Sequence, residues 1–78
     1  MTIPINEITQ IIALQLGIRQ VNPTDHILHD LAAESVDILN IIATIEEKYN
    51  IFIDETTLAT VQTVADLHRL VNTIANEQ

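Results

Sequence analysis

Apolar residues recur at helical spacing through the middle of the chain. Five of them fall on one side of a helix, with polar residues on the other side: Ile38, Ile41, Ile42, Ile45 and Tyr49. The chain is rich in isoleucine, valine and threonine, and these β-branched residues by themselves favour strands. Strand alternation would mix the apolar and polar sets. The spacing therefore predicts a helix from about Ser35 to Tyr49.

Two further long helices are predicted at the ends of the chain. The first runs from Ile3 or Pro4 to Leu16, because Pro4 suits a first helical turn and Gly17 suits the residue after a helix. The last begins after Thr63, where the residues up to Asp66 match a capping pattern. We expect this last helix to bury Val64, Leu67, Val71 and Ile74.

A long connection, residues 18–34, separates the first two helices. It contains the turn signal Asn22-Pro23-Thr24-Asp25, and three apolar residues are expected to anchor it to the core: Ile27, Leu28 and Leu31. Residues 48–54 alternate like a strand, but no partner strand is predicted, so we expect a loop there.

A short helical turn is expected over residues 55–59. The predicted fold is therefore all-α, a small four-helix bundle of three longer helices and a short third helix. We expect residues 1–78 to form a single domain, because a chain of this length buries one small core.

Charge restricts the partners of the protein. Eleven acidic residues against three basic ones give a net charge of −8. Such a chain repels phosphate backbones and anionic lipid, so nucleic-acid and membrane-surface roles are disfavoured and basic partners are favoured. The sequence has no cysteine, no signal peptide and no apolar run long enough to span a bilayer. We expect a cytoplasmic monomer.

Ser35 is the residue most suited to carry the function. It lies between two acids, Glu34 and Asp37, where an irregular polar segment becomes a helix. There its hydroxyl would face solvent beside unpaired helix N–H groups, which tolerate an anion such as a phosphodiester. The simpler interpretation is that Ser35 is the N-cap of the helix, and the two roles are compatible.

The residues from Asp30 to Glu47 follow the pattern D-L-x-A-[DE]-S-[LV]-D-x-[LV]-x-[LI]-[LI]-x-x-[LI]-E-E. This pattern resembles the acyl carrier protein family, whose serine receives a 4′-phosphopantetheine arm. Further matches at Leu16-Gly17-Ile18, Ile53-Asp54-Glu55 and residues 61–67 extend the resemblance over nearly the whole chain. The sequence departs from the family in having Ala32 for Gly, Glu34 for Asp, Val36 for Leu, and Asn40 where an acid is frequent.

The resemblance implies a carrier and not an enzyme. A phosphopantetheinyl transferase would move the arm from coenzyme A to Ser35, and acyl groups would then load on the arm's thiol. Acyl-transferring and ketosynthase-type enzymes would be the further partners, in fatty acid biosynthesis or specialised acyl biosynthesis. The carried chain would shelter between the second and third helices, in a pocket lined by Ile27, Leu28, Ile41, Ile42, Ile45, Ile53, Leu58 and Val61.

Three apolar or small residues of the central helix lie off its core stripe: Val36, Leu39 and Ala43. Isolated exposed apolar residues are ordinary, but these lie near Ser35 and among acids. We interpret them as a partner-recognition strip that also includes Glu34, Asp37, Asn40, Glu46 and Glu47.

Other functions are weighed against this one. An aminoacyl or peptidyl carrier would use the same arm without an acyl pocket, and a helical adaptor would keep the fold without the arm. A serine hydrolase is disfavoured, because no oxyanion-hole signature accompanies the histidines His26 and His29. His26, His29 and Asp30 could also be read as metal ligands. Two loop histidines without a third strong ligand nearby are more often solvated or capping side chains, so we expect no metal site. His68 is expected to be a half-buried packing residue.

Overall fold

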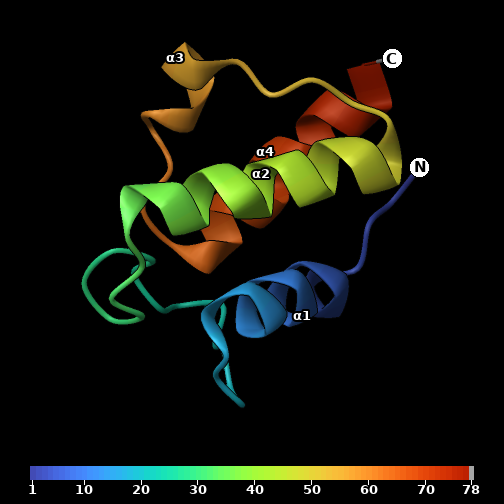
Figure 1. Cartoon of the computed structure of the whole chain (residues 1–78). Coiled ribbons are helices and arrows are strands. Elements are labelled where there is room, and N and C mark those ends of the chain that lie inside the picture. The colour runs from blue at the N-terminus through green and yellow to red at the C-terminus, as the bar shows by residue number, and fades with distance from the viewer. Residues whose placement is uncertain (78) are drawn as a thin grey trace.

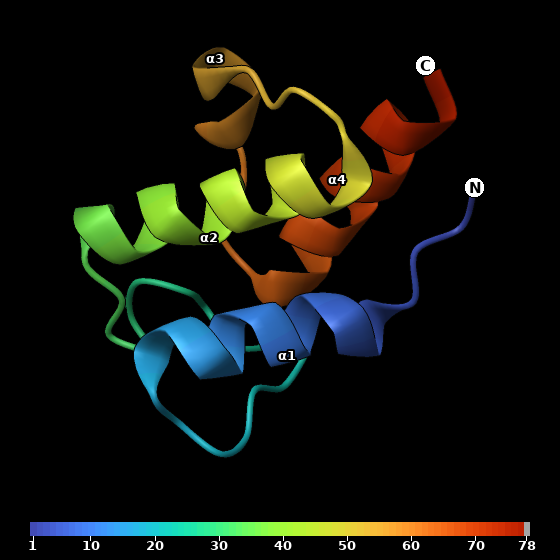
Figure 2. The ribbon, with the colours of Figure 1, turned by 45° about the vertical axis from the view of Figure 1, so that its right-hand side comes forward.

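The computed structural model describes residues 1–77, and within that range it contains four helices and no strand. The helices are α1 (Ile5–Leu16), α2 (Ser35–Tyr49), α3 (Glu55–Leu58) and α4 (Val64–Glu77). In Figures 1 and 2, α1 runs alongside α2 in the opposite direction, α4 packs behind them, and the short α3 lies on the other side of α2. The predicted all-α fold of three longer helices and one short helix is confirmed.

The core lies between the three long helices and is mostly isoleucine. Ten of the fifteen buried apolar residues are isoleucines, including Ile8 and Ile12 of α1 and Ile41 and Ile45 of α2. In α4 the prediction needs one correction, because Ala75 is buried while Ile74 is only partly buried. The buried stripe of α4 runs at Val64, Leu67, Val71 and Ala75, so Ile74 falls at its edge.

The long connection is fixed to the start of α4 by its backbone. The first N–H groups of a helix have no partner within the helix. Here the amides of Val64 and Ala65 donate to the carbonyls of Asp25 at 3.1 Å and Pro23 at 2.9 Å. The Ile27 amide in turn donates to the Gln62 carbonyl at 2.9 Å. The connection therefore serves as the cap of a helix that lies far from it in sequence.

The prediction that three residues anchor the connection to the core is wrong for Leu28. Ile27 is buried and Leu31 is partly buried, but Leu28 is 48% exposed. The backbone turns back on itself here, with the Asp30 amide donating to the His26 carbonyl at 2.8 Å. This turn carries Leu28 around to the outside.

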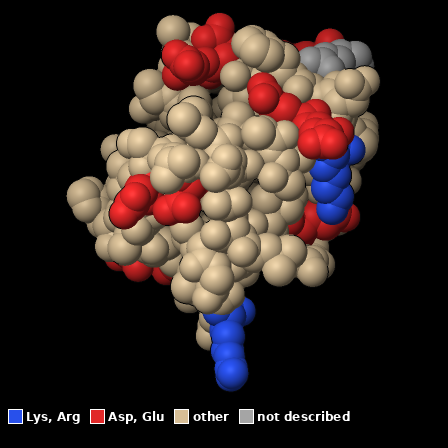
Figure 3. Space-filling view, in the orientation of Figure 1, with Lys and Arg blue, Asp and Glu red and all other residues tan. Residues whose placement is uncertain are grey.

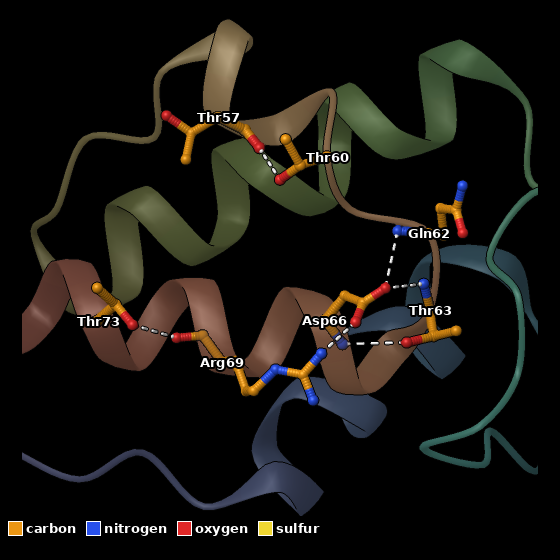
Figure 4. A network of polar contacts seen from close by, with 7 residues as sticks. All are labelled: Thr57, Thr60, Gln62, Thr63, Asp66, Arg69 and Thr73. Carbon is orange, nitrogen blue, oxygen red and sulfur yellow. Dashed lines mark hydrogen bonds and ion pairs between the residues drawn. The ribbon is translucent and has the colours of Figure 1, made fainter.

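A network around Asp66 closes the same region from the other side (Figure 4). The Asp66 carboxylate accepts hydrogen bonds from the amides of Thr63 at 3.0 Å and Gln62 at 3.2 Å, and it also pairs with Arg69. The Asp66 amide donates to the Thr63 hydroxyl at 3.1 Å, which confirms the predicted capping pattern. The hydrogen bonds from Thr63 and Gln62 lower the pKa of Asp66.

The residues before α1 are attached to α4. Ile3 is buried, its amide donates to the Asn72 side-chain oxygen at 2.7 Å, and its carbonyl oxygen lies 2.7 Å from Nε2 of His68. His68 is partly buried, as predicted, and its ring also helps to fix the N-terminal segment.

The side chain of Tyr49, at the end of α2, contacts the first turn of α1. Its hydroxyl donates a hydrogen bond to the Glu7 carboxylate, and Lys48 Nζ lies 3.5 Å from the same carboxylate. Burial of the ring, followed by the hydrogen bond to negatively charged Glu7, raises the pKa of Tyr49 to about 12. The same hydrogen bond lowers the pKa of Glu7.

This contact gives a direct prediction, because Tyr49 is the only tyrosine and the chain has no tryptophan. Phenolate absorbance therefore reports Tyr49 alone. The ionisation midpoint should lie at about 12 in the folded protein and at about 10 in urea. Because folding raises the pKa of Tyr49, the protonated hydroxyl stabilises the folded state. This contribution is fully present below about pH 10 and is lost as the pH rises through the pKa of the folded protein. A folded midpoint equal to the midpoint in urea would contradict the contact.

Candidate functional site

Ser35 is exposed at the first residue of α2, and the residue that occupies the N-cap position is Glu34. The interpretation of Ser35 as the N-cap is therefore wrong. The Asp37 carboxylate closes the helix start instead, by accepting a hydrogen bond from the Glu34 amide at 3.0 Å. Because Asp37 has this role, the Ser35 hydroxyl is not needed to begin the helix.

The turn that delivers the chain to Ser35 contains a strained alanine. Ala32 has a φ of 54°, in the left-handed region that favours glycine. The turn is held by Ala33, which is buried and whose amide donates to the Ile27 carbonyl at 3.2 Å. Left-handed backbone costs a residue with a Cβ about 1–2 kcal/mol. This is the position at which the resembled family usually has glycine.

We expect Ala32→Gly to stabilise the fold. Relief of strain exceeds the extra chain entropy that glycine gains on unfolding, so the free energy of unfolding should rise by about 0.5–1 kcal/mol. The free energy of unfolding is measured by urea denaturation, with circular dichroism as the signal. Ala33→Gly is the matched control: it removes a buried methyl group and should lower stability. Equal or lower stability of Ala32→Gly would contradict the assigned backbone conformation.

The predicted recognition residues lie along one face of α2. Val36 is 57% exposed and Leu39 59% exposed, and the exposed set also includes Glu34, Asn40, Ala43 and Glu47. Figure 3 shows a neutral centre over α2, with acidic side chains at the start of α2, near its end and over α3. The strip is thus apolar at its centre and acidic at its margins.

Two of the predicted recognition acids have structural partners and are only half-exposed. Asp37 accepts from the Glu34 amide, and Glu46 accepts from the Ile53 amide at 2.8 Å. Glu46 thereby holds the loop after α2 against the helix. The sequence gives no sign of this second contact, because it depends on where the loop folds back.

A cavity of about 290 Å³ lies between α2, α3 and the long connection. Six of the predicted pocket residues line it: Ile27, Leu28, Ile41, Ile42, Leu58 and Val61. The other two do not, since Ile45 is fully enclosed in the core and Ile53 faces a second hollow. Six further residues complete the lining: His26, Ile38, Glu55, Ala59, Gln62 and Leu67.

Only some of these additional residues could be found from the sequence. Ile38 lies one turn before Ile41 and Ile42 on the same apolar stripe, so periodicity places it beside them. His26 and Gln62 come from two loops that meet through the isolated bridge between His26 and Thr63. Sequence spacing does not indicate that meeting.

The second hollow is more open and lies between the end of α2 and the loop before α3. Its lining includes Leu39, Ala43, Glu46, Ile53 and Phe52, whose side chain is 72% exposed. The sequence analysis did not single out Phe52. It extends the apolar centre of the α2 face towards α3.

The competing site interpretations gain no support from the described part of the chain. Across residues 1–77, no group of three or more metal-ligating side chains comes together. The rings of His26 and His29 lie against each other, 4.2 Å apart, and over the same range neither is hydrogen-bonded to Ser35. No helix in this range is long and apolar enough to cross a membrane.

Comparison with known proteins defines the class. A family described as "Phosphopantetheine attachment site" matches residues 6–71, which include all of α2 and the turn before Ser35. An acyl carrier protein of Chlamydia caviae is 34% identical over 70 residues, covering 87% of this chain and 91% of that protein. A probable acyl carrier protein of Caulobacter vibrioides is 40% identical over 53 residues, covering 68% of this chain and 62% of that protein. The chain belongs to the acyl carrier protein family.

Membership implies a covalently attached 4′-phosphopantetheine, and the start of α2 fits that group. Ser35 offers an exposed hydroxyl in the first turn of a helix of 15 residues. The positive end of the helix dipole and the amides of the first turn favour the negative charge of a phosphodiester there.

Proposed function

We propose that Ser35 carries the 4′-phosphopantetheine arm and that the protein presents acyl groups, as thioesters on that arm, to successive enzymes. One observation supports the proposal: Ser35 lies within the range matched by the family, it is exposed at the start of α2, and its hydroxyl does not cap the helix. The arm supplies the thiol on which the acyl group is held. The protein supplies the attachment oxygen, the helix amides around the phosphodiester and the faces that partners contact, and we assign it no catalytic step.

Modification tests this directly, because Ser35 is the only serine in the chain. Incubation with coenzyme A, Mg²⁺ and a broad-specificity phosphopantetheinyl transferase should add one phosphopantetheinyl mass to the wild type. Ser35→Ala should gain no mass in the same reaction. Intact mass spectrometry reads both. Addition to the alanine variant would show that Ser35 is not the attachment residue, and failure of several transferases on the wild type would favour an unmodified adaptor.

We propose fatty or related acyl chains as cargo, housed in the cavity between α2 and α3. Support comes from its walls, which are mostly aliphatic, and from its position beside the helix that begins at Ser35. Each CH₂ group removed from water contributes about 0.8 kcal/mol. An aminoacyl or peptidyl cargo would gain little from such walls. Fatty acid biosynthesis and specialised acyl biosynthesis would both supply suitable chains.

A bulky side chain that fills the cavity should prevent the acyl chain from stabilising the protein. A medium-length saturated acyl chain on the arm should raise the thermal unfolding midpoint of the wild type above that of the arm-only form. Ala59 lines the cavity and is exposed, so Ala59→Phe should remove most of that rise without unfolding the bare protein. Thr60→Phe, at an exposed neighbour outside the lining, is the control and should keep the rise. No rise in the wild type would point to an aminoacyl or peptidyl carrier.

We propose that partners contact the strip around Val36, Leu39 and Ala43. Its support is the exposure of two large apolar side chains beside Ser35 with acids at the margins. Small apolar centres with polar rims are typical of transient interfaces. Asn40 is exposed and neutral where the family often has an acid, so we expect partner choice here to depend less on charge along this face.

Substitution of Leu39 tests the strip. Leu39→Ser should lower kcat/KM with the transferase or a ketosynthase by about tenfold, because truncating a hot-spot residue at the centre of an interface costs more than about 1 kcal/mol. Leu14→Ser is the matched control, since Leu14 is 76% exposed on α1 and does not belong to the strip. Both variants should keep the wild-type unfolding midpoint. Equal activity losses in the two variants would show that the strip is not the contact.

A further inference from the structure

His26 differs from the aliphatic residues around it in the cavity. It is half-buried and lines the cavity together with Ile27, Leu28 and the apolar face of α2. Its backbone is held on both sides: its amide donates to the Asp30 carboxylate at 2.7 Å, and its carbonyl accepts from the Asp30 amide at 2.8 Å. The imidazole is thus mounted on a fixed segment of the cavity wall.

One hydrogen bond of the His26 ring assigns the tautomer of the neutral imidazole. The backbone amide of His29 donates to Nδ1 of His26 at 3.2 Å. A ring nitrogen that accepts a hydrogen bond has no proton, so the neutral imidazole is protonated at Nε2. Among residues 1–77, no group accepts a hydrogen bond from Nε2, and no carboxylate oxygen forms an ion pair with the ring. His26 therefore carries an N–H at Nε2 that has no acceptor among the described residues and is open to solvent, because no buried side-chain nitrogen or oxygen in this range lacks a partner.

An unused donor discriminates between ligands. A purely aliphatic chain that covered Nε2–H would take it out of water without giving it a partner, which is unfavourable. A chain with an oxygen at that depth would supply the acceptor. A site with a hydrogen-bond donor for a ligand oxygen binds the analogue without that oxygen much more weakly. This difference in affinity is larger than the one that an apolar site makes between chains that differ by one CH₂ group.

We propose that Nε2–H of His26 donates a hydrogen bond to an oxygen of the tethered chain; where that oxygen belongs to the cargo beyond the thioester, the cavity favours such acyl groups over saturated groups of equal length. The inference rests on the proposed attachment of the arm to Ser35. The acceptor is a hydroxyl or carbonyl oxygen, and either the cargo or the arm itself can provide one. The two sources are separated by the experiment.

The experiment compares four proteins in three loaded states. The proteins are the wild type, His26→Phe, which keeps a planar ring without a donor, His26→Gln, which keeps a donor, and His29→Ala. The states are arm only, a saturated medium-length chain, and a chain of the same length bearing a hydroxyl near the thioester. Thermal unfolding midpoints are measured for each state, and for the unmodified protein.

In the wild type, the hydroxylated chain should raise the midpoint at least as much as the saturated one, although it is the more polar. In His26→Phe the gain from the hydroxylated chain should fall by at least half, and the gain from the saturated chain should not fall. His26→Gln should retain part of the preference. His29→Ala should retain all of it, because the group that fixes Nδ1 is a backbone amide.

The source of the acceptor follows from the same data. If His26→Phe reduces only the gain from the hydroxylated cargo, the cargo supplies the oxygen. If it reduces the gain on adding the arm alone, the arm supplies it. If neither the gain from the hydroxylated cargo nor the gain on adding the arm changes in His26→Phe, the proposal is overturned.

A second measurement uses only the wild type, so it tests the proposal even if His26→Phe does not fold. Imidazole nitrogen and proton shifts in the wild type should show Nε2–H moving on loading with the oxygen-bearing chain and not with the saturated chain. Equal shifts that are already present in the arm-only state would assign the acceptor to the arm, and no shift in any state would also overturn the inference. Absence of any added mass at Ser35 would instead refute the proposed function, so the two failures are distinguishable.

Discussion

The backbone hydrogen bonds between the long connection and the start of α4 organise the rest of this structure. They supply the acceptors that the first amides of α4 lack, and they bring residues 22–27 against the linker that follows α3. One wall of the cavity exists because these two irregular segments meet. The Asp66 network fixes the linker from the opposite side. Without these contacts, the connection would have no defined path from α1 to the turn before Ser35.

The helix α2 combines three tasks that are compatible because they use different parts of it. One face is isoleucine and packs in the core, the opposite face is exposed, and the first turn presents Ser35. Asp37 caps the helix start, which leaves the serine hydroxyl available. The strained backbone at Ala32 lies just before this turn. A local cost in stability is therefore located where the chain must turn sharply to reach the attachment site.

The sequence predicted the helices well because their apolar spacing is strong. In α2 the periodicity outweighed the strand preference of isoleucine, and the Thr63-to-Asp66 cap was found by its pattern alone. The misses occurred where a side chain's environment depends on a distant segment. Leu28 is turned outward by the fold of its own loop, and Ala75 replaces Ile74 in the core because the buried stripe of α4 continues from Val71 to Ala75. Glu46, which is predicted to belong to the partner face, also holds the loop at Ile53, a contact that the sequence does not indicate.

The sequence by itself determined the helical fold, the excess of negative charge and the position of the candidate serine, because local periodicity, composition and a contiguous motif carry that information. Only the tertiary structure decided which residues enclose the cavity and that Nδ1 of His26 accepts a hydrogen bond from the His29 amide. Both depend on contacts between segments that are far apart or irregular, for which the chain has no repeating pattern. The left-handed backbone at Ala32 was likewise settled by the turn that joins the connection to α2, since alanine alone does not favour it.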